Sequence, residues 1–346
     1  MRLRRILSLS LPSSFIAIVS LGAYLAVTWP YRRPHYDGKE PVSLSVAGMP
    51  GLRMYLDPKD SIITQMILST GSWEDEETDW FLRTVRPGDV VVDAGANVGY
   101  YTIIASRLVG DAGKVYAFEP DPRNFDILRR NVSLNRSKNV VLEQKALSNR
   151  KGTIKLYIAS ANKGDHRIYQ PEGESRPSVD VEAVRLDEYF KDRERAIDVL
   201  KSDTQGAEGV IIEGMAGLLE GRTDGPTIFL EFWPHAMKAI GTEPSDFLSL
   251  LRSHEYRLYE FDPKARNGLR GVKPEDLLST YDRAEEFQPQ TNLMALRGSR
   301  ALPDGLSRIR RPSRKSGEAD PVASSSDFPR PFAGRMKDRG TVPSGY

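Results

Sequence analysis

The sharpest chemical signal in this sequence is an acid followed by a glycine-rich turn. Three valines lead into Asp93, and Gly95, Asn97 and Gly99 follow before a helical pattern that contains Thr102. A dinucleotide-binding turn would read G-x-G-x-x-G and rest a pyrophosphate on the helix N-terminus. The spacing here differs, and a carboxylate at Asp93 would repel a diphosphate. The turn therefore predicts a ligand that carries an amine.

A second acid, Glu119, ends the next strand-like run, KVYAFEP. A carboxylate at this place can accept hydrogen bonds from both ribose hydroxyls of an adenosine ligand. Together Asp93, Gly95, Gly99 and Glu119 resemble the S-adenosylmethionine-binding half of a class I methyltransferase. We expect the donor to contact Asp93, Gly95, Asn97, Gly99, Thr102, Glu119 and Asp203. The alternative is an α/β protein whose acids only cap helices.

Further acids end two later strand-like runs. Asp203 ends IDVLKSD, and Glu231 lies in TIFLEFW. Ligands bind at the carboxyl ends of parallel strands, so we expect Asp203 in the active cleft and Glu231 at the same edge. Glu208, one turn into the following helix, either points to this site or complements the helix N-terminus.

Two histidines are alternative bases. His166 lies in the polar stretch GDHRIYQ, and His235 follows the run that contains Glu231. A lone histidine is more often a surface or structural residue, so Asp203 is the first choice, with Glu231 and His166 as further catalytic candidates. The acids could also bind a hard cation, but they serve a donor and an acceptor equally well, and no metal is expected.

Apolar runs bounded by turn residues alternate with helical patterns from about residue 85 to residue 297. Such alternation predicts parallel strands joined by crossover helices, an α/β fold. Helical spacing also appears over residues 61–85. Between Lys151 and Val184 two strand-like runs flank a polar stretch, which we interpret as an inserted hairpin or lid beside the site.

The two ends of the chain differ from this core. Residues 6–29 are mostly apolar, lie between arginines and approach the length of a membrane span, so residues 1–31 predict a membrane anchor, with a cleaved signal peptide or a buried helix as alternatives. Residues 32–60 are rich in proline and predict a linker with peripheral strands. Residues 61–298 form the predicted catalytic domain. Residues 299–346 are rich in Arg, Ser, Pro and Gly and predict a disordered basic tail.

Composition excludes several classes of protein. A formal net charge of +2 produces no strong field for nucleic acid, so we expect no nucleic-acid partner. The chain contains no cysteine, which excludes disulfides, thiolate nucleophiles and zinc–thiolate sites.

Four segments together resemble the FkbM-type methyltransferases: DAGANVGYYT, AFEPDPRNFDILRRNVSLN, LKSDTQGAEGVIIEGM and TNLMALR. The resemblance implies a doubly wound, Rossmann-like sheet of seven strands and S-adenosylmethionine as the methyl donor. It also implies a hydroxyl acceptor on a glycan, glycolipid or related natural product. Methyl transfer to a hydroxyl requires an aligned acceptor, exclusion of water and a base for one proton.

Two other functions remain open at this point. A nicotinamide-dependent oxidoreductase conflicts with the glycine spacing and with Asp93. A catalytically inactive scaffold of the same fold at a membrane would fail to bind the donor. Because S-adenosylmethionine is a cytosolic metabolite, we expect a single-pass or peripheral membrane protein whose catalytic domain lies in the cytoplasm, although the arginines on both flanks of residues 6–29 leave the topology open.

Overall fold

The computed structural model describes residues 35–193, 196–220, 224–265, 267–282 and 288–298. The apolar helix predicted at residues 6–29 and the tail predicted at residues 299–346 lie outside these residues. No helix in the described part of the chain has both the length and the apolar character needed to cross a membrane.

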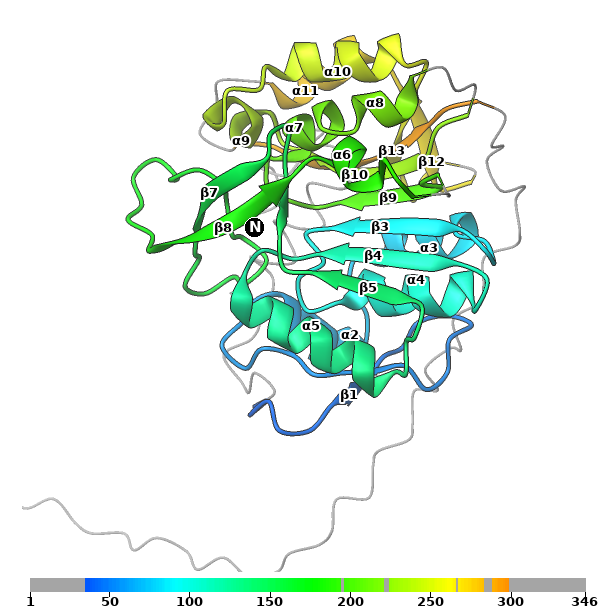
Figure 1. Ribbon diagram of the computed structural model, residues 1–346, viewed down its shortest axis with the longest axis vertical. Helices are drawn as coiled ribbons and strands as arrows, with labels where there is room; N and C mark the ends of the chain where they lie inside the picture. The colour runs from blue at the N-terminus through cyan, green and yellow to red at the C-terminus, as the bar shows by residue number, and fades with distance from the viewer. Residues whose placement is uncertain (1–34, 194–195, 221–223, 266, 283–287, 299–346) are drawn as a thin grey trace, which may run out of the picture. The chain divides into compact units, whose positions relative to one another are not determined.

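The main sheet has eight strands among the described residues, in the order β12-β11-β13-β10-β9-β3-β4-β5 (Figure 1). The five strands from β10 to β5 run parallel, and β13 lies antiparallel between β10 and β11. The strands are β3 Val90–Ala94, β4 Lys114–Phe118, β5 Val140–Glu143, β9 Val199–Ser202, β10 Thr227–Phe232, β11 Arg257–Phe261, β12 Leu269–Val272 and β13 Thr291–Leu296.

The parallel α/β architecture is confirmed, but the count of seven strands is wrong by one. The seven strands from β11 to β5 form the expected sheet, and β12 pairs with β11 as an additional antiparallel edge strand. A short edge strand of four residues has little apolar signal, since its two middle residues are exposed. The sequence pattern therefore did not distinguish it from a loop.

Helices cover both faces of this sheet, as a doubly wound fold requires. They are α2 Ile63–Thr70, α3 Asp75–Thr84, α4 Tyr100–Val109, α5 Pro122–Leu134, α6 Leu186–Phe190, α7 Glu208–Glu213, α8 Ala216–Leu219, α9 Pro234–Ala239, α10 Pro244–Ser253 and α11 Pro274–Tyr281. Val91 packs in one core with α2, α3 and α4, whereas Val90 and Val92 pack in a second core with α6 to α11. Burial on both faces explains why this strand is a continuous apolar run rather than an alternating one.

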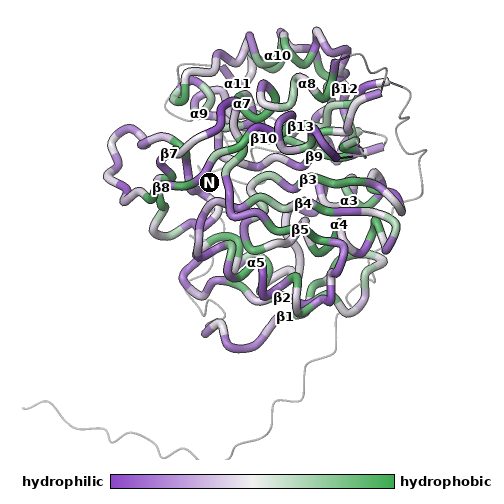
Figure 2. Tube along the Cα trace, viewed as in Figure 1, coloured by the Kyte–Doolittle hydropathy of each residue, from purple (hydrophilic) through white to green (hydrophobic). Residues whose placement is uncertain are grey.

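The segment from residue 151 to residue 184 forms a separate small sheet. β7 Gly152–Tyr157 and β8 Ser178–Val184 pair antiparallel, and β6 Ala146–Leu147 pairs parallel with β8. In Figure 1 this insert lies on the side to which the arrowheads of β3 and β4 point, and Figure 2 shows that its outer loop is largely hydrophilic. The inserted hairpin is thus confirmed, at the edge of the main sheet where ligands bind.

The segment before α2 packs more tightly than its prolines predict. It contains the short strands β1 Val42–Ser43 and β2 Arg53–Met54. Leu52 and Leu56 are buried in the same core as Val91. We expected peripheral strands, but alternate side chains of this segment complete one of the two cores.

Candidate active site

The glycine turn after β3 has positive φ at Gly95, Asn97 and Gly99. A Cβ atom at Gly95 would lie 2.3 Å from the carbonyl oxygen of Asp203, and one at Gly99 would lie 2.6 Å from the side chain of Leu128. Both glycines are therefore required by contacts within the protein, in addition to their backbone angles. The close contact at Gly95 also brings the ends of β3 and β9 together.

Asp93 lies at the end of β3 and is almost completely buried. Thr102, on the first turns of α4, donates a hydrogen bond of 2.5 Å to its Oδ2 atom. Burial raises the pKa of Asp93 to about 6, and the hydrogen bond from Thr102 opposes this shift. Thr102 therefore orients Asp93, and its expected contact with the donor stays a prediction.

Glu119 directly follows β4 and accepts two backbone hydrogen bonds. The N–H of Asn97 donates to Oε2 at 2.7 Å, and the N–H of Asp121 donates to Oε1 at 2.8 Å. Burial raises the pKa of Glu119 to about 8. Each carboxylate oxygen retains a second lone pair, so the group can still accept ribose hydroxyls.

The insert is fastened to this half of the site. The side-chain amides of Asn97 and Asn124 both donate to the carbonyl of Lys163, at 3.2 and 3.0 Å. His166 accepts a hydrogen bond from the N–H of Ala159 at Nδ1, and its Nε2 lies 3.9 Å from Asp121. Burial lowers the pKa of His166. Its contacts thus place His166 beside Asp121, in the loop that follows Glu119.

A buried lysine, which our sequence interpretation missed, lies behind the site. Lys201 in β9 is 2% exposed, and its Nζ lies 2.9 Å from Glu77 and 4.0 Å from both Glu74 and Asp203. Asn292 in β13 donates to Glu74 and Glu77 at 3.1 and 2.6 Å. Burial and the neighbouring Glu77 raise the pKa of Glu74 to about 8.

These missed residues left two signals in the sequence. The acidic run that contains Glu74 and Glu77 opens a helix, where acids are common for another reason. Lys201 interrupts an apolar strand, and a charged residue there is costly unless it is paired. A lysine inside an apolar strand was sufficient to predict a buried ion pair, but the sequence does not show which acids pair with it.

Asp203 and Glu231 are brought together, as predicted for adjacent strand ends. The amide nitrogen of Gln205 donates to Asp203 Oδ1 at 2.9 Å and to Glu231 Oε2 at 3.1 Å. The Asp203 side chain is 30% exposed, whereas Glu231 is 4% exposed. Burial, followed by the charge of Asp203, raises the pKa of Glu231 well above its ordinary value.

Two other candidates have different surroundings. Glu208 accepts hydrogen bonds from the N–H and hydroxyl of Thr204, both at 2.7 Å, and from the N–H of Gly206 at 2.9 Å. It therefore holds the turn that follows Asp203. His235 is exposed at the start of α9, and the described residues contain no cluster of His, Asp and Glu side chains arranged to hold a metal ion.

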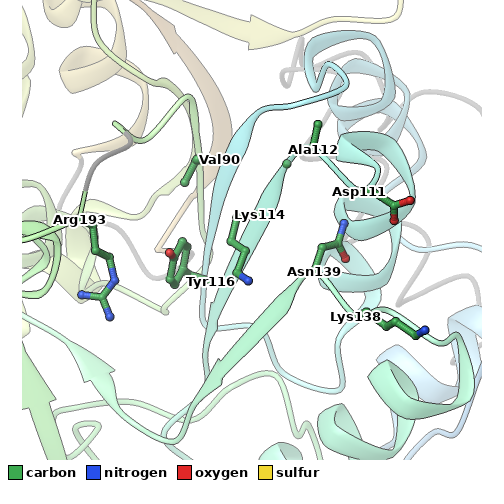
Figure 3. A pocket seen from close by; sticks show the side chains of 9 residues that line it. Val90, Asp111, Ala112, Lys114, Tyr116, Lys138, Asn139 and Arg193 are labelled. Atoms are coloured by element: carbon green, nitrogen blue, oxygen red, sulfur yellow. The ribbon is translucent and has the colours of Figure 1, made fainter.

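A surface cavity lies at the opposite edge of the sheet, away from this site. Figure 3 shows it beside Val90 and Lys114, the first residues of β3 and β4, with Arg193 across from them. The acids described above lie at the other ends of these strands. The cavity is therefore not a candidate for the donor or the acceptor.

The strand order, the glycine turn and the acids at successive strand ends define a Rossmann-like, class I methyltransferase fold. Residues 93–258 match the methyltransferase FkbM domain, and this part of the chain belongs to that family. S-adenosylmethionine is accordingly the cofactor. The residues present fit it, because Glu119 keeps free lone pairs for hydroxyl donors and Asp93 offers a buried carboxylate.

Curated relatives share this part of the chain. Methyltransferase sdnD of Sordaria araneosa is 32% identical over 36% of this chain and 60% of its own length. Hexuronic acid methyltransferase AglP of Haloferax volcanii is 29% identical over 49% of this chain and 64% of its own length. The chain thus spans about three fifths of the curated relatives it matches.

The solved structure of SMU.1697c, a putative methyltransferase from Streptococcus mutans in complex with SAH, is also similar. It is 13% identical, with a TM-score of 0.36, and the match covers 65% of this chain and 98% of that chain. A likeness at this level carries no inference about activity.

Proposed function

We propose that this protein transfers the methyl group of S-adenosylmethionine to a hydroxyl oxygen, on a sugar of a glycan, glycolipid or related natural product. The observation that carries the proposal is the partly exposed carboxylate of Asp203, which lies beside the buried carboxyl group of Glu231. Oxygen methylation needs a base that reaches the acceptor, and Asp203 is the more accessible member of this pair. The sugar acceptor is supported by the name of the relative AglP, which acts on hexuronic acid.

S-adenosylmethionine supplies a methyl group on a positively charged sulfur, so no covalent bond to the protein is needed. Glu119 and Asp93 bind and orient the donor, and Asp203 accepts the proton of the acceptor hydroxyl. Hydrogen bonds from Asn97 in the glycine turn and from Asn124 in α5 to the carbonyl of Lys163 hold the insert beside the donor half of the site.

The proposal is tested by incubating the full chain with S-adenosylmethionine that carries an isotope-labelled methyl group. Glycan, glycolipid, protein and nucleic-acid fractions of a cell extract are offered separately, and the products are analysed by mass spectrometry. Label on a sugar oxygen supports the proposal. Label found only on protein or nucleic acid overturns the acceptor class. Failure of the folded chain to bind the donor would instead favour an inactive scaffold.

Substitution of Asp203 separates binding from chemistry. Asp203→Asn is expected to retain donor binding and to lower turnover of the labelled acceptor by about 10² or more, because the proton has no acceptor of suitable basicity. Calorimetry with the donor and a turnover assay on the same preparation measure the two effects. Asp180→Asn, on an exposed acid of β8, is the matched control. Near-normal turnover would transfer the role to Glu231 or His166.

A further inference from the structure

Gln205 occupies an unusual position between two acids. Its amide nitrogen carries two hydrogens, and the structure places an oxygen of Asp203 at 2.9 Å and an oxygen of Glu231 at 3.1 Å from it. Two neighbouring carboxylates repel each other unless a donor or a proton lies between them. The amide of Gln205 supplies one N–H to each.

The backbone of Gln205 is held in a conformation that few side chains adopt. Its φ is 55°, in the left-handed region. The carboxylate of Glu208 accepts hydrogen bonds from Thr204 on one side and from Gly206 on the other. Glu208 thus fixes this turn, and the fixed turn directs the side chain of Gln205 toward the two acids.

The two acids differ in what occupies their remaining oxygen. The amide of Gln290 donates to Oε1 of Glu231 at 2.9 Å, so both oxygens of this buried group accept an amide. The Oδ2 atom of Asp203 lies 4.0 Å from Lys201, and the side chain is partly exposed. Asp203 therefore has the oxygen that an acceptor can reach.

We propose that Gln205 is a positioning residue for methyl transfer: it holds Asp203 against Glu231 and leaves the second oxygen of Asp203 directed to the acceptor. This inference rests on the proposed function. In the reaction the acceptor oxygen bonds to the methyl carbon, its proton passes to Asp203, and the electron pair of the broken carbon–sulfur bond returns to sulfur. The sulfur thereby loses its positive charge.

Other charged groups also face the pair and contribute to its titration. They lie on the surrounding elements: Lys201 on β9, Glu74 and Glu77 at the start of α3, Asp93 on β3 and Glu208 at the start of α7. A variant of Gln205 leaves all of them in place. A change in pH dependence caused by such a variant therefore reports on the pair.

The test compares donor and product binding and needs no acceptor. Calorimetry measures the affinity of the full chain for S-adenosylmethionine, whose sulfur is charged, and for S-adenosylhomocysteine, whose sulfur is neutral, from pH 5 to pH 9. The ratio of the two affinities reports the charge of groups near the sulfur. In the wild-type chain this ratio is expected to rise with pH as the carboxylates ionise.

Gln205→Leu removes both N–H donors, so the midpoint of this rise is expected about one pH unit higher. Gln205→Glu adds a third carboxylate and is expected to move the midpoint further in the same direction. Gln290 donates a hydrogen bond to Glu231 and none to Asp203, so Gln290→Leu is expected to shift the midpoint by less. Gln170→Leu, on an exposed side chain of the insert, is the control and should leave the midpoint unchanged.

A purely structural role for Gln205 gives a different result. Both affinities would then fall together at every pH, with the midpoint unchanged, and this outcome or an unaltered profile overturns the proposal for Gln205 alone. If the folded wild-type chain binds neither compound at any pH, the proposed function fails as well. Circular dichroism on each variant shows whether the fold is retained.

Discussion

Two buried polar regions lie at the same edge of the sheet, and they are built in opposite ways. The donor half consists of Asp93 and Glu119, whose partners lie within about one strand–helix unit of them in the chain. The cluster around Lys201 joins side chains that are far apart in the sequence, with Glu77 on α3 and Asn292 on β13. In the proposed function local motifs bind the donor, whereas the long-range ion pair of Lys201 with Glu77 supports the strand that precedes Asp203.

This difference predicts which substitutions should lower the stability of the fold and which should weaken donor binding. Both oxygens of Glu119 are held by backbone N–H groups that remain when the side chain is removed and water enters. Lys201 is a buried cation, and Glu77 beside it is equally buried. Removing one member of such a pair leaves an uncompensated charge, so the second region should dominate stability and the first should dominate donor binding.

The largest expected effect is the loss of stability in Lys201→Met. The variant leaves Glu77 and Glu74 without their cation and is expected to lower the free energy of unfolding by about 3–5 kcal/mol. Urea denaturation followed by circular dichroism measures this change. The control Lys155→Met breaks an exposed pair with Asp180 and should cost less than about 1 kcal/mol. Equal costs in the two variants would remove the contrast between the regions.

A second expected effect is confined to donor binding. Above pH 8, where the carboxylate of Glu119 is charged, Glu119→Ala loses the hydrogen bonds proposed between this group and the ribose hydroxyls, and the binding free energy for S-adenosylmethionine should weaken by about 1.5–3 kcal/mol. The midpoint of urea denaturation without donor should change little. Calorimetry provides the affinity, and Glu182→Ala, on an exposed acid of β8, is the control. Unchanged affinity would place Glu119 outside the donor site.

A third expected effect is a gradual slope in stability with pH. Glu119 has a folded pKa of about 8, above its ordinary value, so between about pH 5 and pH 8 the folded chain holds a proton that the unfolded chain has released. Stability without donor should therefore fall as the pH rises through this window, by about 1.4 kcal/mol per pH unit for one such group.

Urea denaturation at each pH measures this slope. Glu119→Gln cannot ionise and should show a shallower slope than the wild-type chain. A wild-type stability that rises from pH 5 to pH 8 would contradict the raised pKa of Glu119.

The sequence alone determined the parallel α/β architecture and the order of acids along its edge. Those features have local causes: a run such as Val90–Val92 is buried on both faces, and an acid with a glycine turn follows it directly. The insert was also predictable, because two strand-like runs flank a long polar stretch. The partners of His166 were not predictable, since Asp121 approaches it only when the insert folds back over the loop after β4.

Only the tertiary structure decided how the acids are paired and which of them is accessible. Asp203 and Glu231 are 28 positions apart, and nothing in their spacing specifies the amide of Gln205 between them. Lys201 in β9 forms an ion pair with Glu77 in α3, which precedes it by more than one hundred positions in the sequence. Burial and charge neutralisation depend on which elements pack together, so the roles of these groups emerge only once the sheet and its helices are assembled.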